Sequence, residues 1–231
     1  MLLRKWDKLP ENMRCDEVKP YYEALKKKQF QLVLKRLFDI VFALILLVIF
    51  AIPMIIIAIL IKSDSPGPVF YRQERVTTYG RVFRIHKFRT MVNNADRIGT
   101  AVTVGNDSRI TKVGSKIRDL RIDELPQLID VLLGDMSFVG TRPEAVKYVN
   151  AYTNEMYATL LLPAGITSEA SIRYKDEAKL LDQADDVDRV YVDEVLPGKM
   201  VWNLKSIEEY SLVKDAMTMF RTVFAVLGKE Y

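Results

Sequence analysis

The feature that most constrains this sequence is an uncharged apolar run of 22 residues, Ile40 to Ile61. As a straight helix it would be about 33 Å long, and the hydrocarbon core of a bilayer is about 30 Å thick. By length alone, the run therefore fits one membrane-spanning helix.

Two details of the run favour a different topology. Pro53 lies near its middle, where a proline removes one backbone hydrogen bond and kinks a helix. Both flanks are basic, whereas a spanning helix normally has its excess of Lys and Arg on the cytoplasmic side only. The basic residues before the run are Lys26, Lys27, Lys28, Lys35 and Arg36, and those after it are Lys62, Arg72 and Arg75. We therefore expect a re-entrant helix over residues 37–64 that breaks at Pro53, with both termini on the cytosolic side. A single spanning anchor is the alternative.

The rest of the chain divides into two parts around this helix. Residues 1–36 form an N-terminal segment whose amphipathic basic helix, over 20–39, either lies at an anionic membrane surface or presents an ordinary solvated face. Residues 65–231 form a cytosolic domain. The predicted fold class is α+β and mostly helical, with a re-entrant membrane helix hairpin, amphipathic interfacial helices and a small β-hairpin.

Periodicity and turn residues predict the elements of the cytosolic domain. We expect a hairpin over 68–91, a polar loop over 94–114, a short helix over 115–122, and an amphipathic helix from Leu125 that Gly134 ends. Another helix is expected to start at Arg142-Pro143, and 161–174 reads as loop and extended chain. An apolar stripe over 212–227 indicates core packing, with a helix on the membrane surface as the alternative.

Composition excludes several kinds of site. The only cysteine is Cys15, which rules out a disulfide framework and a cysteine zinc site. His86 is the only histidine, so a Ser-His-Asp triad is a poor fit and a structural ring is the simpler interpretation. The formal net charge of +4 suits anionic lipid or phosphate but is too small to indicate nucleic acid, which we exclude as a partner. The sequence has no GxxxxGK[ST] loop and no GxGxxG motif.

Two adjacent acids, Asp123 and Glu124, precede the helix predicted from Leu125. Acids at a helix N-terminus commonly cap free N–H groups, and this is the simplest interpretation. Adjacent helical residues point about 100° apart, so the pair suits two separate roles better than one shared proton. Phosphoryl transfer needs little beyond positioning, positive charge and a hard cation, and a carboxylate can itself attack phosphorus.

Five motifs occur in an order that resembles the bacterial sugar transferases, and in particular the minimal catalytic form of the monotopic phosphoglycosyl transferases. They are DSPGPVFYRQERV, HKFRTM, RIDELPQL, DMSFVGTRP and PAGIT, and the resemblance runs from about residue 30 to the C-terminus. Two positions depart from the family pattern: Ile52 stands where the Ser of a Ser-Pro helix break is common, and Thr141 stands where a proline often precedes Arg-Pro.

The resemblance implies an enzyme of the first membrane step in bacterial glycoconjugate assembly, at the cytosolic face of the cytoplasmic membrane. It would transfer a phospho-sugar from a UDP-sugar to polyprenyl (undecaprenyl) phosphate and release UMP. Asp123 would be the nucleophile, with a covalent aspartyl phospho-sugar intermediate, and Glu124 would assist it; both would hold Mg²⁺. Phosphates would be held by Lys87, Arg89, Arg142, Pro143, Arg72 and Arg75. Asp193 matches a downstream acidic position to which no role is given.

The expected partners are the two substrates and inner-membrane lipid, with a homodimer left open. The alternative function is a catalytically silent, membrane-anchored partner of a polysaccharide assembly complex. It would tolerate the loss of Asp123.

Overall fold

The computed structural model describes residues 2–95, 108–175, 177 and 186–226. It is mostly helical, with two small sheets. The helices are α1 (Lys19–Lys26), α2 (Gln29–Asp64), α3 (Lys112–Asp119), α4 (Gln127–Leu133), α5 (Val146–Val149), α6 (Glu169–Arg173), α8 (Val187–Val190), α9 (Leu196–Glu208) and α10 (Leu212–Val226). The strands are β1 (Phe70–Val76), β2 (Val82–Phe88), β3 (Met136–Val139) and β4 (Ala164–Thr167). Most of the predicted polar loop over 94–114 lies outside the described residues.

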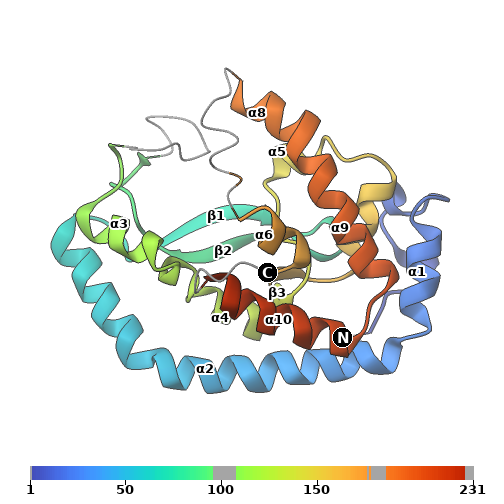
Figure 1. Ribbon diagram of the computed structural model, residues 1–231, viewed down its shortest axis with the longest axis horizontal. Helices are drawn as coiled ribbons and strands as arrows, with labels where there is room; N and C mark the ends of the chain where they lie inside the picture. The colour runs from blue at the N-terminus through green and yellow to red at the C-terminus, as the bar shows by residue number, and fades with distance from the viewer. Residues whose placement is uncertain (1, 96–107, 176, 178–185, 227–231) are drawn as a thin grey trace.

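Helix α2 contains the whole apolar run and is the one helix in the described residues that is long and apolar enough to cross a membrane. Its secondary structure runs through Pro53 without interruption, so the break predicted there is not seen. The helix instead bends, and its C-terminal part turns up toward α3 (Figure 1). A bend is the usual result when a proline inside a helix leaves a carbonyl one turn back without its intrahelical partner.

Only one side of α2 is covered by protein. Its buried positions, at helical spacing, are Leu32, Lys35, Asp39, Ala43, Ile57 and Ile61. Its large exposed side chains include Leu44, Ile45, Val48, Ile49, Ile52, Ile55, Ile56, Ile59 and Leu60. A contiguous apolar face of this size on a soluble monomer is unusual, and it marks α2 as a surface for membrane or protein contact.

Both ends of α2 are attached to the same domain. Near its N-terminal end, Arg36 donates to the carbonyl oxygens of Val131 (2.6 Å) and Leu132 (2.9 Å) at the end of α4. At its C-terminal end, the carboxylate of Asp64 accepts from the backbone N–H of Val113 in α3 (2.9 Å). Because α3 and α4 are consecutive parts of one body, they hold the two ends of α2 on the same side of it (Figure 1).

Strands β1 and β2 form the predicted antiparallel hairpin, in a register that pairs Phe70 with Phe88 and Val76 with Val82. The predicted helices over 115–122 and from Leu125 are confirmed as α3 and α4, each shifted by two or three residues. Gly134, in the left-handed region at φ 90°, ends α4 as expected.

Strands β3 and β4 form a parallel pair that the sequence did not predict. Two glycines, Gly140 just past β3 and Gly165 within β4, allow the backbones to approach closely. A Cβ on Gly165 would lie 2.2 Å from the backbone nitrogen of Gly140, so only glycine fits there. This contact brings the FVGTRP and PAGIT motifs together. Residues 169–173, read as extended chain, form α6 instead, because Ser168 accepts from the N–H of Ser171 and caps it.

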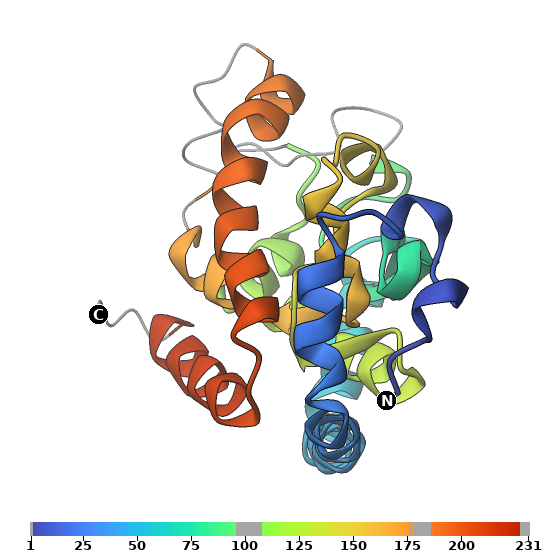
Figure 2. The same ribbon diagram turned by 90° about the vertical axis from the view of Figure 1, so that its right-hand side faces the viewer.

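The N-terminal segment is built into the core. Helix α1 packs beside α9 (Figure 2), with Tyr22 and Leu25 buried. The segment over 20–39, predicted as one amphipathic helix, is divided between α1 and α2. Because Tyr22 and Leu25 are buried, the apolar side of α1 packs on protein. One buried cluster joins this segment to the distal part of the domain and includes Leu9, Met13, Val18, Leu25, Tyr148, Leu161, Tyr191 and Met200.

Helix α10 does not bury its apolar stripe, so the core-packing interpretation is wrong for most of it. Its exposed large side chains are Val213, Met217, Phe220 and Val223. An ion pair between Lys35 and Asp215 (2.6 Å) holds α10 beside the N-terminal part of α2.

Candidate active site

The acid pair lies on a tight turn between α3 and α4. Arg121 has left-handed backbone torsion angles (φ 54°), and the chain then forms a 3-10 turn, η5, over Ile122–Glu124. Helix α4 begins later than predicted, at Gln127, with Pro126 at its N-cap and no capping side chain among the described residues. The prediction that the acids cap this helix is therefore wrong.

The carboxylate of Glu124 pairs with two cationic side chains from different parts of the fold. Lys87, on β2, donates to Oε1 at 2.8 Å. Arg142, in the loop after β3, donates to Oε2 at 3.2 Å and also forms a short contact with Oε1. The fold thus brings together one residue from each of three of the motifs, HKFRTM, RIDELPQL and DMSFVGTRP.

Burial and the paired charges act in opposite directions on Glu124 and on Lys87, and the pKa values of both groups lie below their ordinary values. Burial raises the pKa of Glu124, but Arg142 and Lys87 outweigh it, so that pKa lies well below its ordinary value. Burial lowers the pKa of Lys87, and Glu124 opposes that change. Glu124 is therefore an ionised anchor for both cations.

Asp123 has a different environment from its neighbour. Its carboxylate accepts a hydrogen bond from its own backbone N–H, and the ion pairs that other described residues form with this turn all go to Glu124. Burial raises the pKa of Asp123, and the adjacent charge of Glu124 raises it further, while Lys87 and Arg118 act in the opposite direction. Two neighbouring carboxylates thus have pKa values pushed apart, which is typical of pairs with two separate roles.

The loop that carries Arg142 is fixed from β1. Arg75 donates to the carbonyl oxygen of Pro143 at 3.2 Å, and the N–H of Val76 donates to the carbonyl oxygen of Glu144 at 2.9 Å. The helix predicted from Arg142-Pro143 is not present, and α5 starts only at Val146. Arg75 and Pro143 thus support the loop that carries Arg142.

Arg89 and Arg72, which were also expected to bind phosphate, form their hydrogen bonds with groups other than Glu124. Arg89 is buried and donates to the carbonyl oxygens of Ser65 (2.7 Å) and Pro66 (2.9 Å), which fixes the turn after α2. Arg72 donates to the carbonyl oxygen of Arg84 and lies 2.5 Å from Nε2 of His86.

His86 is a structural ring, as predicted. Its Nδ1 lies 2.6 Å from the buried carboxylate of Asp130 on α4, while its Nε2 faces Arg72. Asp193, in the π-helical turn η7 (Tyr191–Val195), is exposed and pairs with Arg189 at 3.4 Å.

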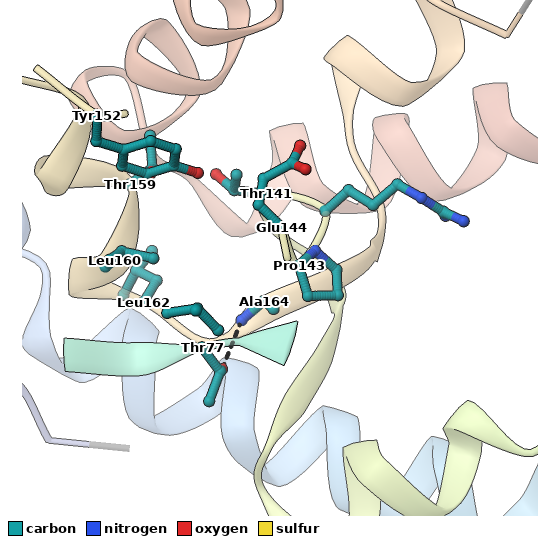
Figure 3. A pocket seen from close by; sticks show the side chains of 11 residues that line it. Thr77, Thr141, Pro143, Glu144, Tyr152, Thr159, Leu160, Leu162 and Ala164 are labelled. Carbon is teal, nitrogen blue, oxygen red and sulfur yellow. Dashed lines mark hydrogen bonds between the residues drawn. The ribbon is translucent and has the colours of Figure 1, made fainter. Parts of the chain in front are cut away.

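A buried polar network behind Arg142 was not anticipated from the sequence. Glu144, directly after Arg142-Pro143, accepts from Tyr191 (2.7 Å) and from Lys199 (3.3 Å). The only sequence signal was an acid next to the Arg-Pro pair. A cavity of about 10 Å³ lies beside this loop, with Pro143 and Glu144 on one side and Tyr152, Thr159 and Leu160 on the other (Figure 3). It has room for about one water molecule, so it is a packing space and not the substrate site.

The acid pair fits a magnesium ion only together with a phosphate. The described residues contain no group of three or more metal-ligating side chains. Mg²⁺ is, however, commonly held by one or two carboxylates plus substrate phosphates. Asp123 is available for this role, whereas Glu124 already has two cationic partners.

These features define a class of protein: one with a site of two carboxylates and two cations, on a domain with an uncovered apolar helix. The sequence model of one protein family, described as bacterial sugar transferase, matches residues 30–229. This chain belongs to that family.

Several relatives carry explicit names. The chain is 38% identical to a UDP-N-acetylgalactosamine-undecaprenyl-phosphate N-acetylgalactosaminephosphotransferase of Aeromonas hydrophila, over 74% of this chain and 38% of that protein. It is 36% identical to a UDP-glucose:undecaprenyl-phosphate glucose-1-phosphate transferase of Escherichia coli, over 73% of this chain and 34% of that protein. A shorter relative in Bacillus subtilis, a putative undecaprenyl-phosphate N-acetylgalactosaminyl 1-phosphate transferase, is 45% identical over 54% of this chain and 68% of that protein. The match thus covers little more than a third of the first two.

Proposed function

We propose that this protein transfers a sugar 1-phosphate from a UDP-sugar to a polyprenyl phosphate, in an early membrane step of polysaccharide synthesis. The observation that carries the proposal is the unequal pair: Asp123 is not ion-paired to any described residue, while Glu124 is bound to Lys87 and Arg142. The names of the relatives support the choice of substrates.

In the first step, a carboxylate oxygen of Asp123 attacks the phosphorus that bears the sugar. The bond between this phosphorus and the bridging oxygen of the diphosphate breaks, and UMP leaves with the bonding electron pair. In the second step, an oxygen of the polyprenyl phosphate attacks the same phosphorus. The acyl-phosphate bond breaks, the diphosphate-linked sugar leaves on the lipid, and Asp123 is restored as a carboxylate.

Lys87 and Arg142 would bind phosphate oxygens in both steps. Arg142 offers a planar fork that suits a phosphate, and Arg75 holds the loop that carries it. Glu124 would keep both cations in place between turnovers.

A magnesium ion would be held by Asp123 and the substrate phosphates, and by Glu124 once these phosphates take over one of its two cations. The reason is charge: Glu124 already pairs with Lys87 and Arg142, and Asp123 adds a second negative charge, so a diphosphate needs additional positive charge to bind. When bound, Mg²⁺ would neutralise the charge that develops on the leaving phosphate.

The re-entrant topology stays part of this proposal. It is supported by the attachment of both ends of α2 to one domain and by the uncovered apolar faces of α2 and α10. A helix that crossed a bilayer would separate its ends by about 30 Å of hydrocarbon. Both termini would then be cytosolic, with the site at the interface where the head group of a polyprenyl phosphate lies. A homodimer stays a prediction.

The proposal is tested by measuring the nucleotide that is released when the purified protein in detergent receives undecaprenyl phosphate, Mg²⁺ and a panel of UDP-sugars. We expect UMP from at least one sugar nucleotide. Release of UDP would indicate ordinary glycosyl transfer, and release of no nucleotide from any sugar would favour a catalytically silent partner.

A further inference from the structure

Gln127 is a buried polar side chain that the proposed mechanism does not use. It is the first residue of α4, and 1% of its surface is exposed. Among the described residues, neither its amide nitrogen nor its amide oxygen has a hydrogen-bond partner. A buried polar group without a partner lowers the stability of a fold, and an apolar side chain of the same size would avoid that cost. Its polar atoms therefore suggest a role in an arrangement other than the resting one.

The backbone places Gln127 on the same side of the helix as Glu124. Leu125 (φ −52°) and Pro126 (φ −62°) both have right-handed helical torsion angles, so the chain winds continuously from η5 into α4. Residues three positions apart share a face in both a 3-10 helix and an α-helix. Gln127 therefore follows Glu124 by about one turn on the same face of the chain.

Substrate binding would change the partners of Glu124. In the resting arrangement its carboxylate accepts from Lys87 and Arg142. Phosphate oxygens bound by the same two cations would compete with it for these N–H groups. A largely buried carboxylate that loses cationic partners needs another donor to stay ionised and in place.

We propose that Gln127 is a positioning residue for the phosphoryl transfer. When a substrate phosphate takes over Lys87 or Arg142, the amide nitrogen of Gln127 donates to Glu124 and keeps it beside Asp123. This inference rests on the proposed function, and Gln127 takes part in no covalent step.

The first test replaces Gln127 by methionine, which has a similar length and no amide. We expect the midpoint of thermal unfolding to stay the same or rise, because two unpaired polar atoms are removed. We expect kcat for UMP release to fall about tenfold to a hundredfold, the effect of one lost hydrogen bond to a charged group. The KM for the UDP-sugar should change much less. The control is Leu128→Met, a buried apolar exchange at the next position, which should leave kcat unchanged.

The second test replaces Gln127 by glutamate. Burial beside Glu124 would raise the pKa of the new carboxyl group, and its protonated form can donate as the amide does. We expect the ratio of the variant's kcat to that of the wild type to rise as the pH falls from about 8 to about 6.

Three outcomes would overturn the positioning role. They are wild-type kcat in Gln127→Met, a joint loss of folding and activity in that variant, and a glutamate ratio that does not change with pH. Failure of the proposed function is recognised separately, because the wild-type protein itself would then release no UMP.

Discussion

Glu124 and Arg142 form an ion pair that joins the turn before α4 to the loop after β3, 18 positions apart in the sequence. Lys87 joins the same carboxylate from β2. The pair leaves Asp123, the other acid of the turn, without an ion-pair partner among the described residues, and this asymmetry leads to the first three predictions.

Replacing Asp123 by asparagine should give a folded and inactive protein. The amide keeps the shape of the side chain but is a poor nucleophile, so UMP release should fall by at least about a thousandfold. Circular dichroism and thermal unfolding should match the wild type within about 1 kcal/mol, because Asp123 has no ionic partner among the described residues to lose. The matched control is Asp119→Asn, an exposed acid on α3 that should keep full activity. Retained activity in Asp123→Asn would rule out the nucleophile.

Activity should be lost in mild acid, at a pH higher than the pH at which an ordinary aspartate is protonated. The attacking group is the ionised carboxylate, and burial together with Glu124 raises the pKa of Asp123 above its ordinary value of 3.8. As the pH falls through this raised pKa, the nucleophile is protonated and kcat decreases. A pH profile of single-turnover UMP release measures this, with the folded state checked by fluorescence at each pH. An acid limb at or below the ordinary value would contradict the assignment.

Replacing Glu124 by glutamine should destabilise the protein at neutral pH, by about 1–3 kcal/mol, because Lys87 and Arg142 would then face each other without a counter-charge. The pKa of Glu124 is depressed in the folded state, so its contribution to stability is fully present above the ordinary value of 4.5. That contribution is lost as the pH falls through the depressed folded-state pKa. The difference in urea midpoint between variant and wild type should therefore shrink toward low pH. Glu23→Gln, which breaks only an exposed pair with Lys26, is the control and should cost less than about 1 kcal/mol.

Local patterns predicted the elements around the site well. The hairpin, α3 and α4 follow from alternation, helical spacing and the glycine at position 134, all of which act within a few residues. The acid pair and its two cations were also found from the sequence, because the motifs that carry them lie in the resembled order.

Long-range contacts explain what was missed. The parallel pairing of β3 with β4 depends on Gly140 and Gly165 meeting across 25 positions, which no local window contains. Lys199 and Tyr191 join Glu144 from the long helical segment near the C-terminus for the same reason. The capping interpretation of the acids failed because the carboxylate of Glu124 pairs with the tertiary partners Lys87 and Arg142 and not with backbone N–H groups of α4.

The N-terminal segment should be required for stability, although the family match begins only at residue 30. Leu25 is fully buried in the cluster that contains Tyr191 and Met200. Leu25→Ala should therefore lower the free energy of unfolding by about 2–5 kcal/mol, from lost burial and the cavity left behind. Leu2→Ala, at an exposed leucine of the same segment, is the control and should change it by less than about 0.5 kcal/mol. Equal effects would mean that the segment is not part of the core.

Both ends of α2 should be accessible from the same side of the membrane. The two ends are bound to one domain through Arg36 and Asp64, so a spanning arrangement would require one of these attachments to open. The measurement uses a Cys15→Ser background with single cysteines at Lys27 and Glu74, two exposed positions on opposite sides of the apolar run. An impermeant maleimide should label neither cysteine in intact spheroplasts and both in inverted membrane vesicles. The Cys15→Ser parent, which has no cysteine, should stay unlabelled in both preparations. Labelling of one cysteine in each preparation would show that α2 crosses the bilayer, and the attachments at its ends would then have to be reassigned.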